Sequence, residues 1–302
     1  MPVIRPPSLL PTLASTLGLF RHAHRGLADP VQMPCIERSL PAGSFAPKWL
    51  KAYCDCIGLP AVPQDCLPPL ALQIAAAPLH MAILADVAFP FPALGLVHMT
   101  QNVTQTKSIP ADASLTLRAY SGDAQLEKRG MSFCLITEAS LLGEVVWRGE
   151  TRALAIDRSR QAAPSNAQDR APGESAVPTK SRCEIRLQVQ EPTGRHYAAI
   201  AGDLNPIHQH ALLARLFGFR RAIVHGTWTL ARALVLAELS QLPAYSLQAR
   251  FRRPVELPSA IRIRACTEGQ QHSVQVLSDD GLQSFIEVQL NADAAGERSG
   301  SR

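Results

Sequence analysis

The stretch that decides the fold is Gly202-Asp203-Leu204-Asn205-Pro206-Ile207-His208, which is followed by Gly218-Phe219 and then by His225-Gly226-Thr227. Asn205 is a favourable helix N-cap and Pro206 suits the first helical position, so the sequence predicts a short helix here. Asp203 would lie just before this helix and His208 within its first turn. Both side chains can then converge on one small volume.

The pairing of these two side chains suggests a chemistry. A carboxylate and an imidazole that share one water suit general acid–base hydration, because one group takes a proton from the water while the other supplies a proton to carbon. Taken alone, Asp203 and His208 are equally compatible with a helix cap and a surface histidine. The surrounding sequence has to decide between these interpretations.

The residues around this segment predict a sheet wrapped around a helix. Residues 226–239 are apolar nearly all round and contain no interior glycine or proline, which predicts a helix that other elements enclose. Apolar and polar residues alternate over 183–189, as in a half-buried strand. Asp279, Asp280 and Gly281 supply a hairpin turn. Further strands are expected at 245–254, 260–267, 273–277 and 282–290. The predicted class is α+β, with an antiparallel sheet curled around a central helix.

The N-terminal half repeats this order of elements more loosely. A mostly apolar helical stretch at 70–87 precedes strand-like runs at 115–120, 132–139 and 144–155. Between the halves, residues 158–180 are rich in Ala, Pro, Ser, Gln and charge, and such a segment cannot bury enough apolar surface to order itself. We therefore expect an N-terminal domain at 1–157, a flexible linker at 158–180 and a C-terminal domain at 181–302.

Composition narrows the class of protein. The net charge is only +5 and aromatic residues make up 5% of the chain. The sequence therefore lacks the basic stripe with interleaved aromatics that is typical of nucleic-acid binding. No apolar stretch reaches the roughly 18 to 20 residues of a membrane span. Seven cysteines and no evident secretory signal predict reduced thiols in the cytoplasm. Cys54 and Cys56 have no second pair at zinc-like spacing, and no nucleotide, serine-hydrolase or metalloprotease motif occurs, so neither a metal nor a cofactor is expected.

A family resemblance rests on the residues quoted above. Tyr197, the segment 202–208, Gly218-Phe219 and His225-Gly226 at the start of an apolar helix resemble the hydratase signature of the MaoC-like dehydratase family, which includes the (R)-specific enoyl-CoA hydratases. Phe89-Pro90-Phe91-Pro92 and Leu94 to His98 look like the first half of tandem members. The resemblance implies a double hot-dog fold whose N-terminal half, lacking the Asp and His, is degenerate and completes the substrate tunnel.

The resemblance also implies roles for single residues. Asp203 and His208 would hold and activate the water, and Gly226 would offer its backbone N–H to the thioester carbonyl. A helix N-terminus suits that last role on physical grounds, because its free N–H groups and partial positive charge stabilise a developing enolate. The candidates for substrate binding are Asn205, Tyr197, Thr227 and His225, although packing or loop-shaping roles are the alternatives for each, and for His225 a structural role is favoured.

The expected activity is reversible hydration of trans-2-enoyl thioesters to 3(R)-hydroxyacyl thioesters of coenzyme A or acyl carrier protein. A hot-dog thioesterase and a non-catalytic acyl-thioester binding protein are the alternatives, and a homodimer is possible. The sequence departs from the family at Arg220-Arg221-Ala222, where members often carry a proline. Arg220, Arg221, Arg252 and Arg253 could contact the phosphates of coenzyme A or an acidic carrier, or could simply be solvated.

Overall fold

A computed structural model describes residues 3–4, 35–91, 95–157, 183–203 and 205–292 of the 302-residue chain. The expected linker at 158–180, and Pro92 and Leu94 of the two stretches that resemble the first half of tandem members, lie outside these residues. None of the helices within them has both the length and the apolar character that a bilayer span requires.

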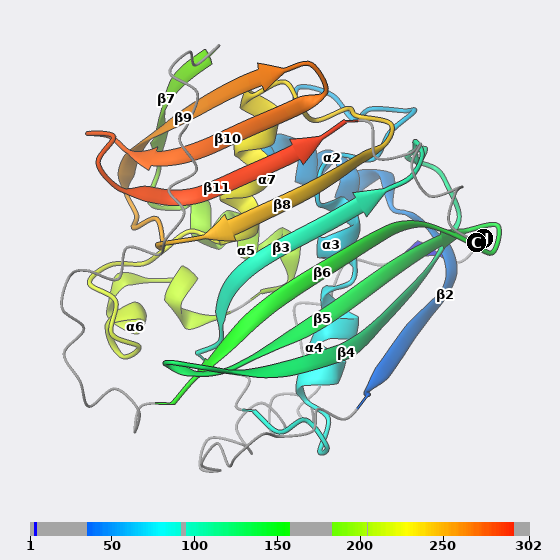
Figure 1. The fold of residues 1–302 in the computed structure, drawn as a ribbon, viewed down its shortest axis with the longest axis horizontal. Coiled ribbons are helices and arrows are strands. Elements are labelled where there is room, and N and C mark those ends of the chain that lie inside the picture. The colour runs from blue at the N-terminus through cyan, green and yellow to red at the C-terminus, as the bar shows by residue number, and fades with distance from the viewer. Residues whose placement is uncertain (1–2, 5–34, 92–94, 158–182, 204, 293–302) are drawn as a thin grey trace.

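All the described strands belong to one continuous sheet (Figure 1), in the order β1-β2-β4-β5-β6-β3-β8-β11-β10-β9-β7. The two halves of the chain meet where β3 pairs antiparallel with β8, with Thr100 opposite Arg250 and Gln105 opposite Tyr245. The strands span Val3–Ile4, Glu37–Phe45, Val97–Gln105, Leu115–Glu127, Gly130–Leu141 and Glu144–Ile156 (β1 to β6), then Cys183–Val189, Tyr245–Phe251, Ser259–Glu268, Gln271–Ser278 and Ser284–Asn291 (β7 to β11).

The C-terminal half wraps its strands around helix α7 (Gly226–Leu236), as the apolar sequence predicts (Figure 1). The helix buries residues on almost every side, including Trp228, Leu230 and Leu234. Three short elements lie at its N-terminal end: α5 (Thr193–Ala201), the single 3-10 turn η2 (Pro206–His208) and α6 (Ala211–Arg215).

The N-terminal half has the same plan with a broken helix. The helix expected at 70–87 is in fact two, α3 (Ala71–Ala75) and α4 (Ala77–Leu84), which join at Ala76 just before Pro78. Proline lacks an N–H and clashes with the preceding turn, so one continuous helix is disfavoured there. With a sheet around a helical core in each half, the double hot-dog fold is confirmed.

The elements that were not predicted from the sequence are β1, β2, β3, α2 (Pro47–Ile57), α5 and α6. Helix α2 joins the two halves, since the indole of Trp228 in α7 donates a hydrogen bond to the Cys56 carbonyl (2.9 Å) and the indole of Trp49 donates to the Ile200 carbonyl (3.1 Å). The N-terminal half therefore packs directly against α5 and α7, the helices on either side of the segment that carries Asp203 and His208.

Candidate active site

The Asp203 loop follows α5 and is shaped by its own hydrogen bonds. Gly202 ends α5 with a left-handed backbone (φ 71°), which glycine adopts without strain. The Asn205 N–H then donates to Asp203 Oδ1 (3.0 Å), and Asn205 Oδ1 accepts from the Ile207 N–H (3.4 Å) as the N-cap of η2. The predicted capped turn is confirmed, and Asn205 shapes the loop that carries Asp203.

His208 is held in one orientation. Its Nδ1 lies 2.9 Å from the Ile223 carbonyl oxygen, which can only accept, so Nδ1 carries the proton and donates. In the neutral ring Nε2 then bears the lone pair. This Nε2 lies 3.8 Å from Asp203 Oδ2, and the His208 side chain is only 9% exposed whereas that of Asp203 is 49% exposed. The predicted convergence of the two side chains is therefore observed, with the carboxylate on the open side.

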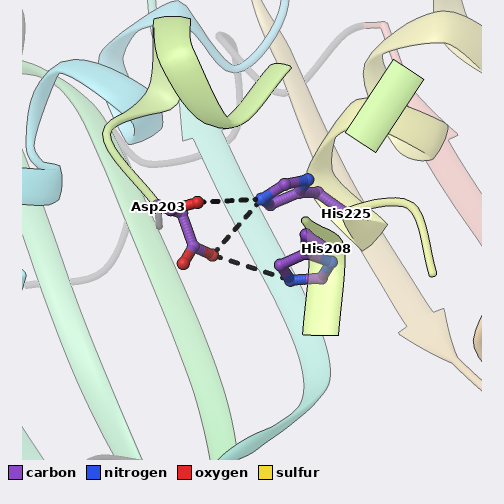
Figure 2. A group of neighbouring side chains, drawn as sticks. All are labelled: Asp203, His208 and His225. Carbon is purple, nitrogen blue, oxygen red and sulfur yellow. Dashed lines mark hydrogen bonds and ion pairs between the residues drawn. The ribbon is translucent and has the colours of Figure 1, made fainter. Parts of the chain in front are cut away.

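His225 completes a cluster of three side chains (Figure 2). It is the N-cap residue of α7, and its Nε2 lies 3.6 Å from Asp203 Oδ2 and 3.4 Å from the Asp203 main-chain oxygen. Its ring stacks on that of His208, with centroids 3.6 Å apart and planes at 24°. A mainly structural role had been favoured for His225, but the structure brings it into the same group as Asp203 and His208.

The electrostatics of the cluster keep Asp203 charged and His225 neutral. Burial alone would raise the pKa of the Asp203 carboxyl, but His225, His208 and the Asn205 N–H outweigh it and lower that pKa below its usual value. Burial, followed by repulsion from His208, lowers the pKa of His225 well below its usual value. At neutral pH the site therefore presents a carboxylate next to a neutral imidazole at position 225.

Tyr197 and Thr227 lie behind the cluster. The Tyr197 side chain is fully buried, and its hydroxyl donates to Thr227 Oγ1 (3.1 Å). Its ring lies 5.0 Å from His225 and 6.4 Å from Tyr53 of α2. A row of rings thus runs from the N-terminal half to the site, and it comprises Phe45, Trp49, Tyr53, Tyr197, His225 and His208. This row was not predicted, because its members come from five different elements.

Gly226 begins α7, and the N–H groups of the first helical turn have no acceptor within the helix. Phe251, at the end of β8, closes over this glycine: a Cβ added at position 226 would lie 2.8 Å from the Phe251 ring. The ring of His98 in β3 packs against the other side of Phe251, at 4.3 Å between centroids. Neither Phe251 nor His98 was singled out in the sequence as part of the site.

The same three side chains could hold a divalent cation. One ligand atom from each of Asp203, His208 and His225 lies within 4.8 Å of the others. Two imidazoles and a carboxylate form a known ligand set for first-row metals, and His208 donates its second nitrogen to a carbonyl as metal-bound histidines do. The sequence predicted no metal, and a chelator control is therefore part of the experiments below.

Comparisons with known proteins find both a matching family model and a related sequence. Residues 173–284 match the family model of the MaoC like domain. The 3-hydroxyacyl-thioester dehydratase X of Mycobacterium tuberculosis is 30% identical over 195 residues, which make up 63% of this chain and 65% of that protein. The match thus spans slightly less than two thirds of that relative's length.

Solved structures extend the likeness to most of the chain. The crystal structure of HtdX from Mycobacterium tuberculosis matches with a TM-score of 0.71 at 25% identity, covering 84% of this chain and 98% of that one. A MaoC-like dehydratase from Phytophthora capsici matches with a TM-score of 0.64 at 15% identity, covering 88% and 97%. Residues 173–284 therefore match a MaoC-like domain, and over most of its length the chain is similar in fold to these solved structures.

Proposed function

We propose that the protein is a hydro-lyase that adds water to trans-2-enoyl thioesters and removes it from 3(R)-hydroxyacyl thioesters. The observation that carries the proposal is the facing pair of Asp203 Oδ2 and His208 Nε2, 3.8 Å apart at the N-terminal end of the enclosed helix α7. The name of the relative that is 30% identical, a 3-hydroxyacyl-thioester dehydratase, supports the same reaction.

The Asp203 carboxylate and the unprotonated Nε2 of a neutral His208 ring are both hydrogen-bond acceptors, so one water can donate a hydrogen bond to each. In the hydration direction the water oxygen forms a bond to C3 of the enoyl group while one water proton passes to the pair. The pair returns one proton to C2, so the net change is the addition of one water. His225, the third member of the cluster, helps to keep Asp203 ionised and supports His208 by stacking.

The charge that develops during this step is placed on the thioester oxygen as C2 becomes enolate-like. The N–H of Gly226 and the positive end of α7 are suited to stabilise that oxygen. Phe251 covers Gly226 and keeps the neighbourhood apolar, which strengthens such a hydrogen bond. Asn205, Tyr197 and Thr227 shape and support the site around the substrate.

The stereochemistry follows from the single location of the acid–base pair. Asp203 and His208 would share one water on one side of the substrate. The hydroxyl group added to C3 and the proton added to C2 are therefore delivered to the same face of the double bond. The expected product is the syn adduct. The 3(R) configuration is proposed from the resemblance to (R)-specific hydratases, and the domain at 1–157 is proposed to complete the substrate tunnel without a second site.

The test uses the purified full chain with crotonyl-CoA and a longer trans-2-enoyl-CoA, in the presence and absence of EDTA. We expect loss of the conjugated enoyl absorbance, a predominantly 3(R) product by chiral chromatography and no effect of the chelator. Release of free thiol is followed in parallel, since thiol release without hydration would show a thioesterase instead. A 3(S) product would mean that the substrate lies across Asp203, His208 and Gly226 in the opposite pose.

A further inference from the structure

An arginine-lined cavity lies outside the acid–base cluster. It has a volume of about 530 Å³ and is lined by Arg215, Gly218, Phe219, Arg220 and Arg221. The three arginines are exposed, and within the described part of the chain none of them pairs with a carboxylate. Several other arginines behave differently: Arg118 binds Glu37, Arg152 binds Asp123 and Arg252 binds Glu287.

Such a grouping of cations favours an anionic ligand. Three guanidinium groups around one hollow repel one another, and nothing in the described residues offsets that repulsion. Guanidinium groups bind phosphate oxygens in a forked geometry that lysine cannot match. Phe219, half-buried in the wall of the cavity, adds an aromatic surface beside the charges. Together these features suit a ligand that carries several phosphates and a flat ring.

The cavity is built on the segment that connects the catalytic groups. Helix α6 follows the turn that holds His208, and the chain reverses at Gly218, whose φ is +88°. It returns through Arg220 and Arg221 to Ile223, whose N–H donates to Ile207 (3.1 Å) and whose carbonyl accepts from His208. The residues that line the cavity are therefore the neighbours, along the chain, of those that orient the catalytic imidazole.

We propose that this cavity binds the 3′-phosphoadenosine diphosphate end of coenzyme A. The inference rests on the proposed function, which places the thioester at Gly226, and it names the carrier of the acyl group. Coenzyme A has a pyrophosphate and a 3′-phosphate for the three guanidinium groups and an adenine for Phe219. A carrier protein offers one phosphodiester, which would leave most of the charge in the cavity unmatched. A carrier protein would instead contact the exposed leucines of α6 and of the residue after it, which are Leu212, Leu213 and Leu216.

The first experiment measures binding without catalysis. Isothermal titration of the full-length protein with coenzyme A, and separately with adenosine 3′,5′-bisphosphate, is compared for the wild type, the variant R215Q/R220Q/R221Q and the control R250Q. Arg250 is an exposed arginine of β8 that likewise forms no ion pair with a carboxylate of the described residues. We expect at least tenfold weaker binding of both ligands by the triple variant and no change in the control. Equal affinity of wild type and triple variant would overturn the proposal.

The second experiment separates this inference from the proposed function. Crotonyl-CoA and crotonyl-pantetheine, which lacks the nucleotide, are compared as substrates. In the triple variant we expect KM for crotonyl-CoA to rise at least tenfold with kcat retained, and kcat/KM for crotonyl-pantetheine to stay unchanged. Equal losses on both substrates would contradict the inference but not the function. If the wild type hydrates neither crotonyl-CoA nor crotonyl-pantetheine, the proposed function is wrong. The titrations with coenzyme A would still show whether the arginine-lined cavity binds the nucleotide.

A third arm tests the competing carrier. The variant L212S/L213S/L216S removes the exposed leucines of α6 and of the residue after it, and leaves the arginines in place. We expect it to retain wild-type KM for crotonyl-CoA. A loss of activity confined to crotonyl-acyl carrier protein, together with coenzyme A binding that does not depend on the three arginines, would assign this surface to a carrier protein and overturn the proposal.

Discussion

The imidazole of His225 lies on that of His208, with ring centroids 3.6 Å apart and planes inclined by 24°. Two protonated imidazoles at this distance would repel each other strongly, so only one of them can readily carry a charge. Burial, followed by His208, lowers the pKa of His225 well below its usual value, and the bond from His208 Nδ1 to the Ile223 carbonyl turns His208 Nε2 toward the carboxylate. The stack is consistent with the proposed proton transfer by Asp203 and His208, with His225 in a supporting position.

The first prediction concerns the acid–base pair. Asp203→Asn and His208→Gln should each lower kcat by about two to four orders of magnitude, since each removes one partner in proton transfer. Thermal unfolding should change little, because Asp203 is half exposed and Gln can still donate toward the Ile223 carbonyl. Near-full activity in either variant would place the reaction elsewhere.

The second prediction concerns His225. Because His225 lowers the pKa of Asp203, the variant His225→Gln should raise that pKa and move the acidic limb of the kcat/KM profile to higher pH. The measurement is a pH–rate profile from about pH 4 to 8 on the wild type and the variant. His196→Gln, a change at an exposed histidine of α5, serves as the control and should leave the limb in place. An unchanged limb in the His225 variant would contradict the electrostatic role.

The third prediction concerns the space at the start of α7. Gly226→Ala would bring its methyl group to 2.8 Å from the Phe251 ring, so the helix N-terminus or the ring must move. A displacement of about 1 Å can reduce turnover by about 100-fold, and we expect a loss of kcat approaching that size. The double variant G226A/F251A should recover part of it relative to F251A alone. No recovery would mean that the loss does not come from this contact.

The fourth prediction concerns a glycine that supports His208 from behind. A Cβ at Gly194 of α5 would lie 2.6 Å from the His208 carbonyl oxygen, which belongs to the backbone and cannot swing away. Gly194→Ala should therefore lower the free energy of unfolding by about 1 to 3 kcal/mol. Urea denaturation of this variant and of the exposed control Ala199→Ser measures the effect. Unchanged stability would show that α5 can shift without cost.

The fifth prediction concerns two histidines of the N-terminal half. Burial lowers the pKa of His80 and of His98 to about 4, while an unfolded histidine titrates near 6.5. Between these values the unfolded chain binds more protons than the native one, so stability is present at neutral pH and falls as the pH drops below about 6.5.

From pH 7.5 to pH 5 each of these histidines should remove about 1 to 2 kcal/mol from the free energy of unfolding. His80 bonds to Thr137 Oγ1 (2.7 Å) and His98 to the Thr100 carbonyl (3.1 Å), and neither belongs to the acid–base cluster. Urea denaturation at both pH values should show a smaller pH effect in His80→Gln and His98→Gln than in the wild type. An equal pH effect in all three proteins would refute the assignment.

The sequence by itself determined the local part of the site and the main elements of the C-terminal half. The cap at Asn205, the turn that carries His208 and the start of a buried helix at Gly226 all depend on neighbours within a few residues, and the structure contains each of them. The strand Cys183–Val189 was likewise predicted in full, because its alternating pattern reflects one buried and one exposed face.

Only the tertiary structure decided which residues from distant parts of the chain contact one another. β2 and β3 were missed because β2 contains Pro41 and Gly43 and β3 is rich in polar residues, so neither shows a clear apolar alternation. The contacts of Phe251 with Gly226, of Tyr53 with Tyr197 and of His225 with His208 join segments distant in sequence. Such contacts depend on how the sheet closes around its helices, and the spacing of residues along a chain carries no record of that closure.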